Sequence, residues 1–165
     1  MGSEAETYLV RLADVRTRLA AHAAAAGSHS GLTTADSRTG ERWDQGQVWA
    51  HLAEFQSFWL GQLERVVAGS AGGATEPVPF GPTVADARRA EIIERDRSVP
   101  VAELWASVEA QTDATRHFLS GLDARGWQAR GLHPSLGVMA MPAMIERFLV
   151  GHLEEHADQL DTLRG

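Results

Sequence analysis

Residues 142–163, PAMIERFLVGHLEEHADQLDTL, decide how this sequence folds. Apolar residues recur there at intervals of three and four, which is the period of one face of an α-helix. His152 and His156 are four residues apart on that face, so both imidazoles leave the same side of the helix. We therefore expect one continuous helix over residues 142–163. Its inward face consists of Ile145, Leu149, His152, His156, Leu160 and Leu163.

Segments upstream show the same helical period. We expect long helices over about residues 4–26, 44–68 and 100–121, and a shorter polar helix over 84–95. The connections, including residues 123–137, are rich in glycine, proline and polar residues, which favours loops. No segment alternates in the manner of a β-strand. The sequence therefore predicts an all-α fold, an antiparallel four-helix bundle with long connections.

The composition fits a single domain over residues 1–165. The chain is 44% hydrophobic and 22% charged, as in an ordinary globular protein. Its net charge of −7 argues against a nucleic-acid partner. No apolar stretch is long enough to span a membrane, and the N-terminus lacks the apolar core of a signal peptide. We expect a cytoplasmic protein that acts on a small-molecule substrate, without nucleic-acid or membrane partners.

Several kinds of catalytic chemistry are excluded by missing residue types. All 15 basic residues are arginine, so no lysine can form a Schiff base. The chain has no cysteine, which excludes thiolate metal sites and cysteine nucleophiles. Neither a phosphate-binding glycine loop nor a Gly-x-Ser-x-Gly motif is present. The chemistry of this chain therefore depends on its histidines.

The seven histidines differ in where the expected helices place them. His117 lies opposite the apolar face of its helix and His29 lies in a loop, while His22 is at the flank of a helix near its frayed end. These three are poor candidates for metal ligands. His152 and His156 instead lie on an apolar face, and a pair at this spacing can direct two nitrogens at one metal ion.

His51 is the expected third ligand. It lies on the same side of its helix as the apolar stripe, and helix packing can bring it opposite the other pair. Three neutral imidazoles leave metal positions open to water or substrate, as in catalytic sites. The alternative is that these residues are hydrogen-bonded core histidines without a metal.

Other polar residues are expected near this site. Glu155 lies close to His152 around the helix, and Glu54 follows His51 by three residues. Each carboxylate is a candidate general base or a partner that orients an imidazole, and the alternative is a surface charge. Gln62 and Gln159 lie on the histidine-bearing faces and are candidates for lining a cofactor pocket. His133 precedes a proline in a loop, so we expect it to serve a turn.

Two parts of the chain resemble the DinB-like (YfiT-like) superfamily of metal-binding four-helix bundles. Residues 43–52, WDQGQVWAHL, resemble the start of the family's second helix. Residues 131–137, GLHPSLG, and 151–160, GHLEEHADQL, resemble its His-Pro-x-x-Gly turn and its H-x-x-x-H helix. The resemblance implies a bundle wound up-down-down-up that binds one divalent ion, usually nickel or zinc. The ligands that it implies are His51, His152 and His156.

The same resemblance implies an activity with a low-molecular-weight thiol such as mycothiol or bacillithiol. Our leading expectation is a metal-dependent thiol transferase, in which the ion stabilises the thiolate of a bound cofactor, since the chain has no cysteine. One alternative is a metal-dependent hydrolase that uses water activated by the ion. Another is a non-catalytic, metal-stabilised bundle that binds a ligand.

The sequence also predicts a homodimer. Trp49 and Val67 lie away from the apolar stripe of their helix, so we expect both to be exposed. Exposed apolar side chains of this size are typical of a subunit interface. Trp59, Trp105 and Phe148 are instead expected in the core.

Overall fold

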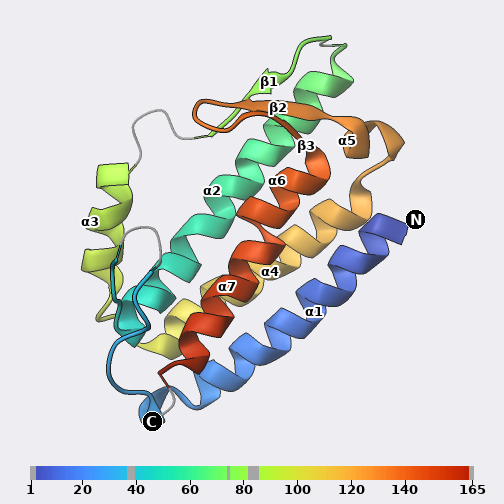
Figure 1. The fold of residues 1–165 in the computed structure, drawn as a ribbon. Helices are drawn as coiled ribbons and strands as arrows, with labels where there is room; N and C mark the ends of the chain where they lie inside the picture. Colours follow the sequence, from blue (N-terminus) through green and yellow to red (C-terminus); the bar gives the residue numbers. More distant parts are fainter. Residues whose placement is uncertain (1–2, 37–39, 74, 82–85, 164–165) are drawn as a thin grey trace.

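Long helices pack side by side in the computed structural model, which describes residues 3–36, 40–73, 75–81 and 86–163 (Figure 1). They are α1 (Ser3–Ala24), α2 (Gln45–Ala71), α4 (Val101–Gly121), and α6 (Met141–Phe148) followed by α7 (Val150–Asp161). Helix α1 packs against α4 and α7, while α2 packs against α4, α6 and α7. Figure 1 shows α1 and the α6–α7 pair running in one direction and α2 and α4 in the other. The fold is thus the expected all-α four-helix bundle, wound up-down-down-up.

The connections contain the smaller elements. A 3-10 helix, η1 (Ala26–Ser28), follows α1, and α3 (Asp86–Asp96) packs against α2 within the α2–α4 connection. Helix α5 (Ala124–Gln128) precedes a hairpin of β2 (Arg130–His133) and β3 (Gly137–Ala140). Strand β1 (Val78–Pro79) pairs in parallel with β2, so the sheet order is β1-β2-β3.

This small sheet corrects the sequence prediction, which contained no strands and left residues 123–137 as a loop. The strands are two to four residues long. Strands this short contain too few residues for a period of two to be detected. Figure 1 shows the sheet at the end of the bundle where α6 begins, away from the C-terminal end of α7.

Helix α2 is the most deeply placed helix of the bundle. Its predicted inner face is buried, as the fold requires: Val48, Leu52, Phe55, Trp59, Leu63 and Val66. The prediction for Trp49 was wrong, since this residue is 0% exposed and its ring meets Trp105 edge-on. Because α2 has helices on several sides, the buried arc of its surface is wider than a single stripe. Val67 is half-buried and packs against the core, so neither residue supports a dimer surface.

The last helix is broken, which also differs from the sequence prediction. Helix α6 ends at Phe148, Leu149 has φ −125° and ψ −89°, and α7 begins at Val150. A Cβ atom on Gly151 would lie 2.3 Å from the carbonyl oxygen of Glu146, so only glycine permits this close approach. The break sets the direction of α7 and therefore the position of its two histidines.

The N-terminus of α2 is fixed by a capping box. The backbone N–H of Gln47 donates to Asp44 Oδ1 (2.9 Å), and the backbone N–H of Asp44 donates to Gln47 Oε1 (3.0 Å). Arg97, beyond α3, also pairs with Asp44. These contacts hold the first turns of α2, which carry His51, against the α2–α4 connection. Among the described helices, none combines the length and the apolar character needed to span a membrane.

Candidate metal centre

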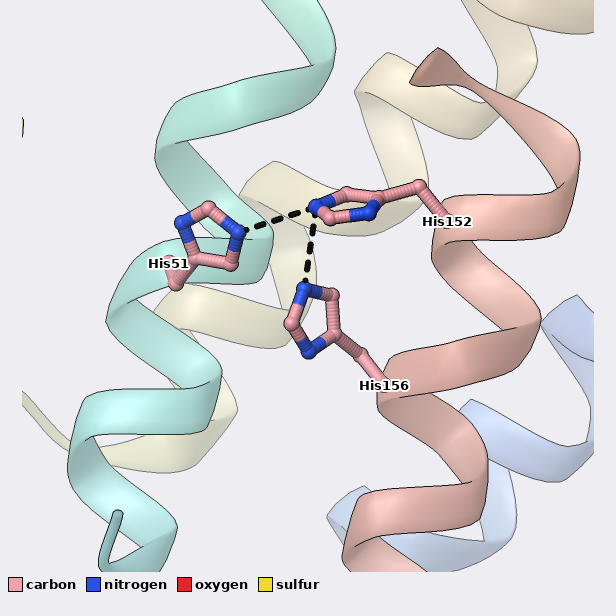
Figure 2. Close-up of side chains that lie close together, drawn as sticks. All are labelled: His51, His152 and His156. Carbon is pink, nitrogen blue, oxygen red and sulfur yellow. Dashed lines mark hydrogen bonds between the residues drawn. The ribbon is translucent and has the colours of Figure 1, made fainter. Parts of the chain in front are cut away.

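Three imidazoles from two helices converge on one point (Figure 2). His51 projects from α2, while His152 and His156 project from α7. The Nε2 atom of His152 lies 3.1 Å from Nε2 of His51 and 3.1 Å from Nε2 of His156. The structure thus brings together the three residues that the sequence singled out, with candidate ligand atoms all within 4.8 Å of one another.

The spacing of these nitrogens fits one metal ion. Zn–N bonds of 2.0–2.1 Å at tetrahedral angles separate two ligand nitrogens by about 3.3 Å. Angles of 90°, as in six-coordination, separate them by about 2.9 Å. The observed 3.1 Å lies between these values.

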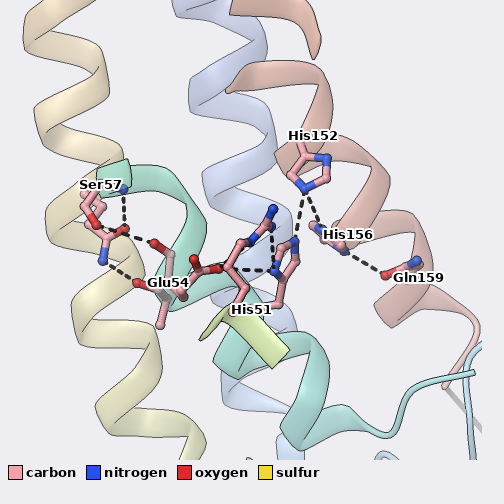
Figure 3. A network of polar contacts seen from close by, with 9 residues as sticks. His51, Glu54, Ser57, His152, His156 and Gln159 are labelled. Atoms are coloured by element: carbon pink, nitrogen blue, oxygen red, sulfur yellow. Dashed lines mark hydrogen bonds and ion pairs between the residues drawn. The ribbon is translucent and has the colours of Figure 1, made fainter. Parts of the chain in front are cut away.

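Each imidazole has a polar partner three residues further along its own helix, and Figure 3 shows those of His51 and His156. His156 Nδ1 donates to Gln159 Oε1 at 2.7 Å. The Nδ1 atom of His152 lies 3.3 Å from Glu155 Oε2, and that of His51 lies 3.5 Å from Glu54 Oε2. All three partners are hydrogen-bond acceptors, so they favour the tautomer that carries its proton on Nδ1.

This tautomer has a direct consequence for the centre of the cluster. With the proton on Nδ1, each Nε2 carries a lone pair, and the three lone pairs face one another at about van der Waals distance. Three lone pairs that face one another repel when nothing lies between them, whereas a cation at the centre is attracted to all three. The donor set therefore fits a divalent metal ion, and three neutral nitrogens suit zinc, nickel and other late first-row ions.

Burial keeps His51 and His156 neutral. His156 and His51 are only 5% and 4% exposed. Burial, with His152 close by, lowers the pKa of His156 to about 3. Burial, followed by the neighbouring His156 and His152, also holds the pKa of His51 well below its usual range. At neutral pH both rings are in the form that binds metal.

Trp43 covers one side of the cluster. Its ring is stacked on His156, with centroids 6.2 Å apart, and it meets His51 edge-on at 5.3 Å. Thr33 holds the tryptophan in place, because its N–H donates to Trp43 O (2.8 Å) and its hydroxyl accepts from Trp43 N–H (3.0 Å). Trp43, which directly precedes the N-cap of α2, is therefore part of the site wall.

A cavity of about 220 Å³ opens beside the three imidazoles. Residues of the segment before α2 line it, together with side chains from α2, α3 and α7. The lining consists of Thr33, Asp36, Glu41, Trp43, His51, Arg89, His152, His156 and Gln159.

The predicted carboxylates lie behind the ligands rather than in the cavity. Glu54 contacts His51 and also Arg89, whose Nε atom is 3.4 Å from Glu54 Oε2. Burial raises the pKa of Glu54, and Arg89 partly offsets this effect. Glu155 is exposed, and its contact with His152 lowers its pKa. Of the two roles considered for these residues, this geometry favours the orientation of an imidazole.

Gln159 and Gln62 have different positions. Gln159 lines the cavity and accepts from His156. Gln62 is not among the residues lining the cavity, and its Oε1 accepts from the backbone N–H of Gly81 (3.0 Å). Gln62 lies on the same face of α2 as His51, as the sequence predicted. The two residues are eleven positions apart, however, which is about 16 Å along the helix, so Gln62 is too far away to line the cavity.

Three other histidines show how far helix position alone predicts their surroundings. His117 is exposed, as expected. His22 was placed wrongly at a frayed flank: it is fully buried, with Nε2 3.0 Å from Asp161 Oδ1. His133 serves a turn, since its Nδ1 accepts from the backbone N–H groups of Ser135 and Leu136.

Four residues of the cavity wall were not predicted from the sequence: Thr33, Asp36, Glu41 and Arg89. Thr33, Asp36 and Glu41 lie in an irregular segment without periodicity, so nothing in the sequence placed them near α7. Arg89 belongs to the expected short helix, but its direction depends on how α3 packs against α2. The one sequence feature that pointed to this region is Glu54, three residues after His51, which pairs with Arg89 in the structure.

No protein-family model matches the chain, and no curated protein matches it in sequence. Solved structures do match its fold. One is YfiT from Bacillus subtilis, described as "a probable metal-dependent hydrolase with an unusual four-helix bundle topology". Its TM-score is 0.73 at 15% identity, over 99% of this chain and 87% of that chain.

The fold is that of YfiT. An uncharacterised protein from Escherichia coli UTI89 matches with a TM-score of 0.66 at 12% identity, over 99% of this chain and 94% of the other. A protein from Clostridium difficile 630 matches at 0.61 and 9% identity, over 98% and 95% of the two chains. The YfiT-like bundle expected from the histidine motifs is thereby confirmed as the fold of this chain.

Proposed function

We propose that this protein is a metal-dependent hydrolase. The observation that carries the proposal is the convergence of three imidazole nitrogens, from His51, His152 and His156, beside a cavity. A divalent ion supplies Lewis-acid chemistry in such a site, since it polarises substrate oxygen atoms and lowers the pKa of water. YfiT, which shares the fold, is itself described as a probable metal-dependent hydrolase, and this agrees with the proposed chemistry.

The residues around the cluster have different roles according to whether they lie behind the imidazoles or line the cavity. Glu54, Glu155 and Gln159 lie at the Nδ1 side of the imidazoles and hold their orientation and tautomer. Asp36 and Glu41 line the cavity beside the imidazoles. A carboxylate that lines the cavity could accept a proton from a water molecule held there, so these two residues are the candidates for the general base. Trp43 limits the access of bulk solvent to the cluster.

Metal content and esterase activity test this proposal together. We expect about one zinc, nickel or similar ion per chain, lost in His51→Ala and His152→Ala. His117→Ala is the matched control, because this histidine is exposed on α4 and should leave metal content unchanged. Hydrolysis of small activated esters should disappear with chelator and return with added ion. Wild-type protein that takes up no ion would contradict the proposal.

The thiol transferase is the second candidate, because the cavity continues into a larger hollow. This hollow of about 600 Å³ shares Glu41, Trp43, His51 and Arg89 with the cavity. A molecule much larger than water, such as a low-molecular-weight thiol, would therefore reach the histidines. Addition of mycothiol to the cobalt-substituted protein should produce a thiolate-to-metal absorption band if this activity is present, and an unchanged spectrum would argue for the hydrolase.

A further inference from the structure

Arg89 lies where three hollows of the molecule meet. It lines the cavity at the histidines, the adjoining hollow of about 600 Å³, and a third hollow of about 710 Å³ between α2, α3 and α4. Its side chain is 23% exposed, so the guanidinium is partly shielded but reachable. Among the described residues that line the first two hollows, Arg89 is the only arginine.

The guanidinium is incompletely used by its protein partners. Its contacts with described residues are 3.4 Å to Glu54 Oε2 and 3.5 Å to His51 Nδ1. The second contact cannot be a hydrogen bond when His51 directs Nε2 at a metal, because Nδ1 then carries a proton. One long ion pair remains for a group with five N–H donors.

The nearby acidic groups have partners of their own. Glu94, which lines the larger hollow, is paired with Arg97 at 2.9 Å. Asp36 and Glu41 also have interactions with other parts of the protein. A singly charged ligand group therefore matches the one available arginine, whereas a dianion would meet more repulsion from these carboxylates.

The larger hollow has apolar surface next to Arg89. Trp43, Ala90 and Ile93 contribute to its wall. A planar carboxylate suits the fork of a guanidinium, and an apolar body attached to it suits this wall. Both features line one hollow, which His51 also lines, so a single ligand can contact them together.

We infer that Arg89 binds a carboxylate of the substrate, so the substrate is a small organic carboxylate with an apolar body. This inference rests on the proposed function, since it names the substrate class of the same site. Arg89 acts here as a positioning and specificity residue, placing the reactive part of such a molecule toward the three imidazoles.

Three probes of the same shape and different charge test the inference. Benzoate, neutral benzamide and cationic benzamidine would be titrated by calorimetry into EDTA-treated and zinc-loaded protein. We expect wild-type protein to bind benzoate at least about 10-fold more tightly than benzamide in both forms. Arg89→Gln should abolish this preference, and Arg89→Lys should retain part of it.

Arg88→Gln is the matched control, because Arg88 is exposed on the same helix and does not line the histidine cavity. Circular dichroism of each variant checks that α3 remains folded, and Arg89→Lys carries the test if Arg89→Gln unfolds. A wild-type preference for benzamide or benzamidine would overturn the inference, as would a preference for benzoate that survives in Arg89→Gln.

These outcomes are separable from those of the proposed function. Benzoate binding that depends on Arg89, in a protein that hydrolyses no ester, would leave the anion site standing and remove the hydrolase. Metal-dependent hydrolysis of neutral and anionic esters at equal rates would support the hydrolase and remove the carboxylate site at Arg89. Tighter binding of phenylphosphonate than of benzoate would overturn the assignment to a carboxylate.

Discussion

The hydrogen-bond partner of each Nδ1 atom determines the tautomer and the orientation of the imidazole, while the Nε2 atom faces the centre of the cluster. His156 provides the clearest case, because its ring is buried and its Nδ1–H donates to Gln159 at 2.7 Å. The same i+3 relation recurs at His51 with Glu54 and at His152 with Glu155. A side chain three residues along a helix is a near neighbour, so one short motif supplies both the ligand and its orienting partner.

Gln159→Leu tests this arrangement. The variant leaves a buried N–H of His156 unpaired and releases its tautomer, so metal affinity should fall by about 10- to 100-fold. Affinity is measured by competition with a chromophoric chelator. Gln159→Glu, which keeps an acceptor, should retain most of the affinity, and Gln128→Leu, at an exposed position on α5, should change nothing. Equal affinity in Gln159→Leu would show that the contact does not orient the ligand.

A second prediction concerns pH. The pKa values of His51 and His156 are lowered in the folded state, whereas the unfolded chain binds protons near pH 6.5. The unfolded state therefore binds more protons below pH 6.5, and the stability of the metal-free protein should fall as the pH falls toward about 3. Each neutral histidine contributes up to about 1.4 kcal/mol per pH unit in this window.

Thermal unfolding of EDTA-treated protein between pH 7.5 and pH 5 measures this slope. His156→Gln should flatten the dependence, since a residue that cannot be protonated no longer favours the unfolded state at low pH. A wild-type midpoint that stays constant over this range would contradict the assignment of buried neutral histidines.

The sequence predicted the ligands better than their surroundings. His152 and His156 are recognisable because two polar rings interrupt an apolar face at a spacing of four. Asp36 and Glu41 are not recognisable, because their place in the cavity depends on the path of an irregular segment. Gln62 shows the opposite error, since a helical wheel records direction around an axis and not distance along it.

At the scale of elements, the break between α6 and α7 is the feature that sequence periodicity could not show. The apolar spacing continues through Leu149 as if the helix were straight, and only Gly151 marks the position. Arg11 of α1 bridges the break, donating to Glu146 at 2.7 Å and to Glu154 at 2.5 Å. The two helices are therefore held at one angle by α1 as well as by their own backbone.

Gly151→Ala should disturb both stability and metal binding. The added methyl group would lie 2.3 Å from the carbonyl oxygen of Glu146, so α7 must shift or the contact must open. We expect a loss of roughly 1–3 kcal/mol in the free energy of unfolding. Chemical denaturation measures this loss, and chelator competition measures the accompanying change in metal affinity.

Gly61→Ala is the matched control for this substitution. Gly61 lies inside α2, and nothing lies within 4 Å of the position of its added Cβ. Because alanine favours a helix more than glycine does, this variant should be more stable by up to about 1 kcal/mol. If the two glycine variants behaved alike, the close approach at Gly151 would not be the cause.

At the scale of the whole molecule, the winding brings α2 and α4 together as parallel neighbours. Parallel neighbours need a crossover that returns the chain along the bundle, and the α2–α4 connection fills this role. Helix α3 lies on that crossover and packs against α2, which is how Arg89 reaches the histidines. The long connection expected from the sequence thus contributes to the site wall as well as joining two helices.

The homodimer stays a prediction, but its interface must lie elsewhere than at Trp49 and Val67. The apolar side chains exposed on the β2–β3 hairpin are Leu132, Leu136 and Val138, which are 43%, 43% and 54% exposed. If this hairpin forms the subunit contact, Val138→Glu should convert a dimer to a monomer in sedimentation equilibrium. Val10→Glu, at a residue 56% exposed on α1, should leave the assembly unchanged. A wild-type monomer at micromolar concentration would end this prediction.

The distance along the chain between the ligands sets an order of events in biosynthesis. His51 and His152 are 101 residues apart, and an ion bound by both would close a loop of that length. On the ribosome, α2 emerges and begins to pack long before α7 has been translated. The complete nitrogen cluster exists only after the last helix docks, so we expect the folded bundle to bind an ion with all three nitrogens and the incomplete chain to offer at most two.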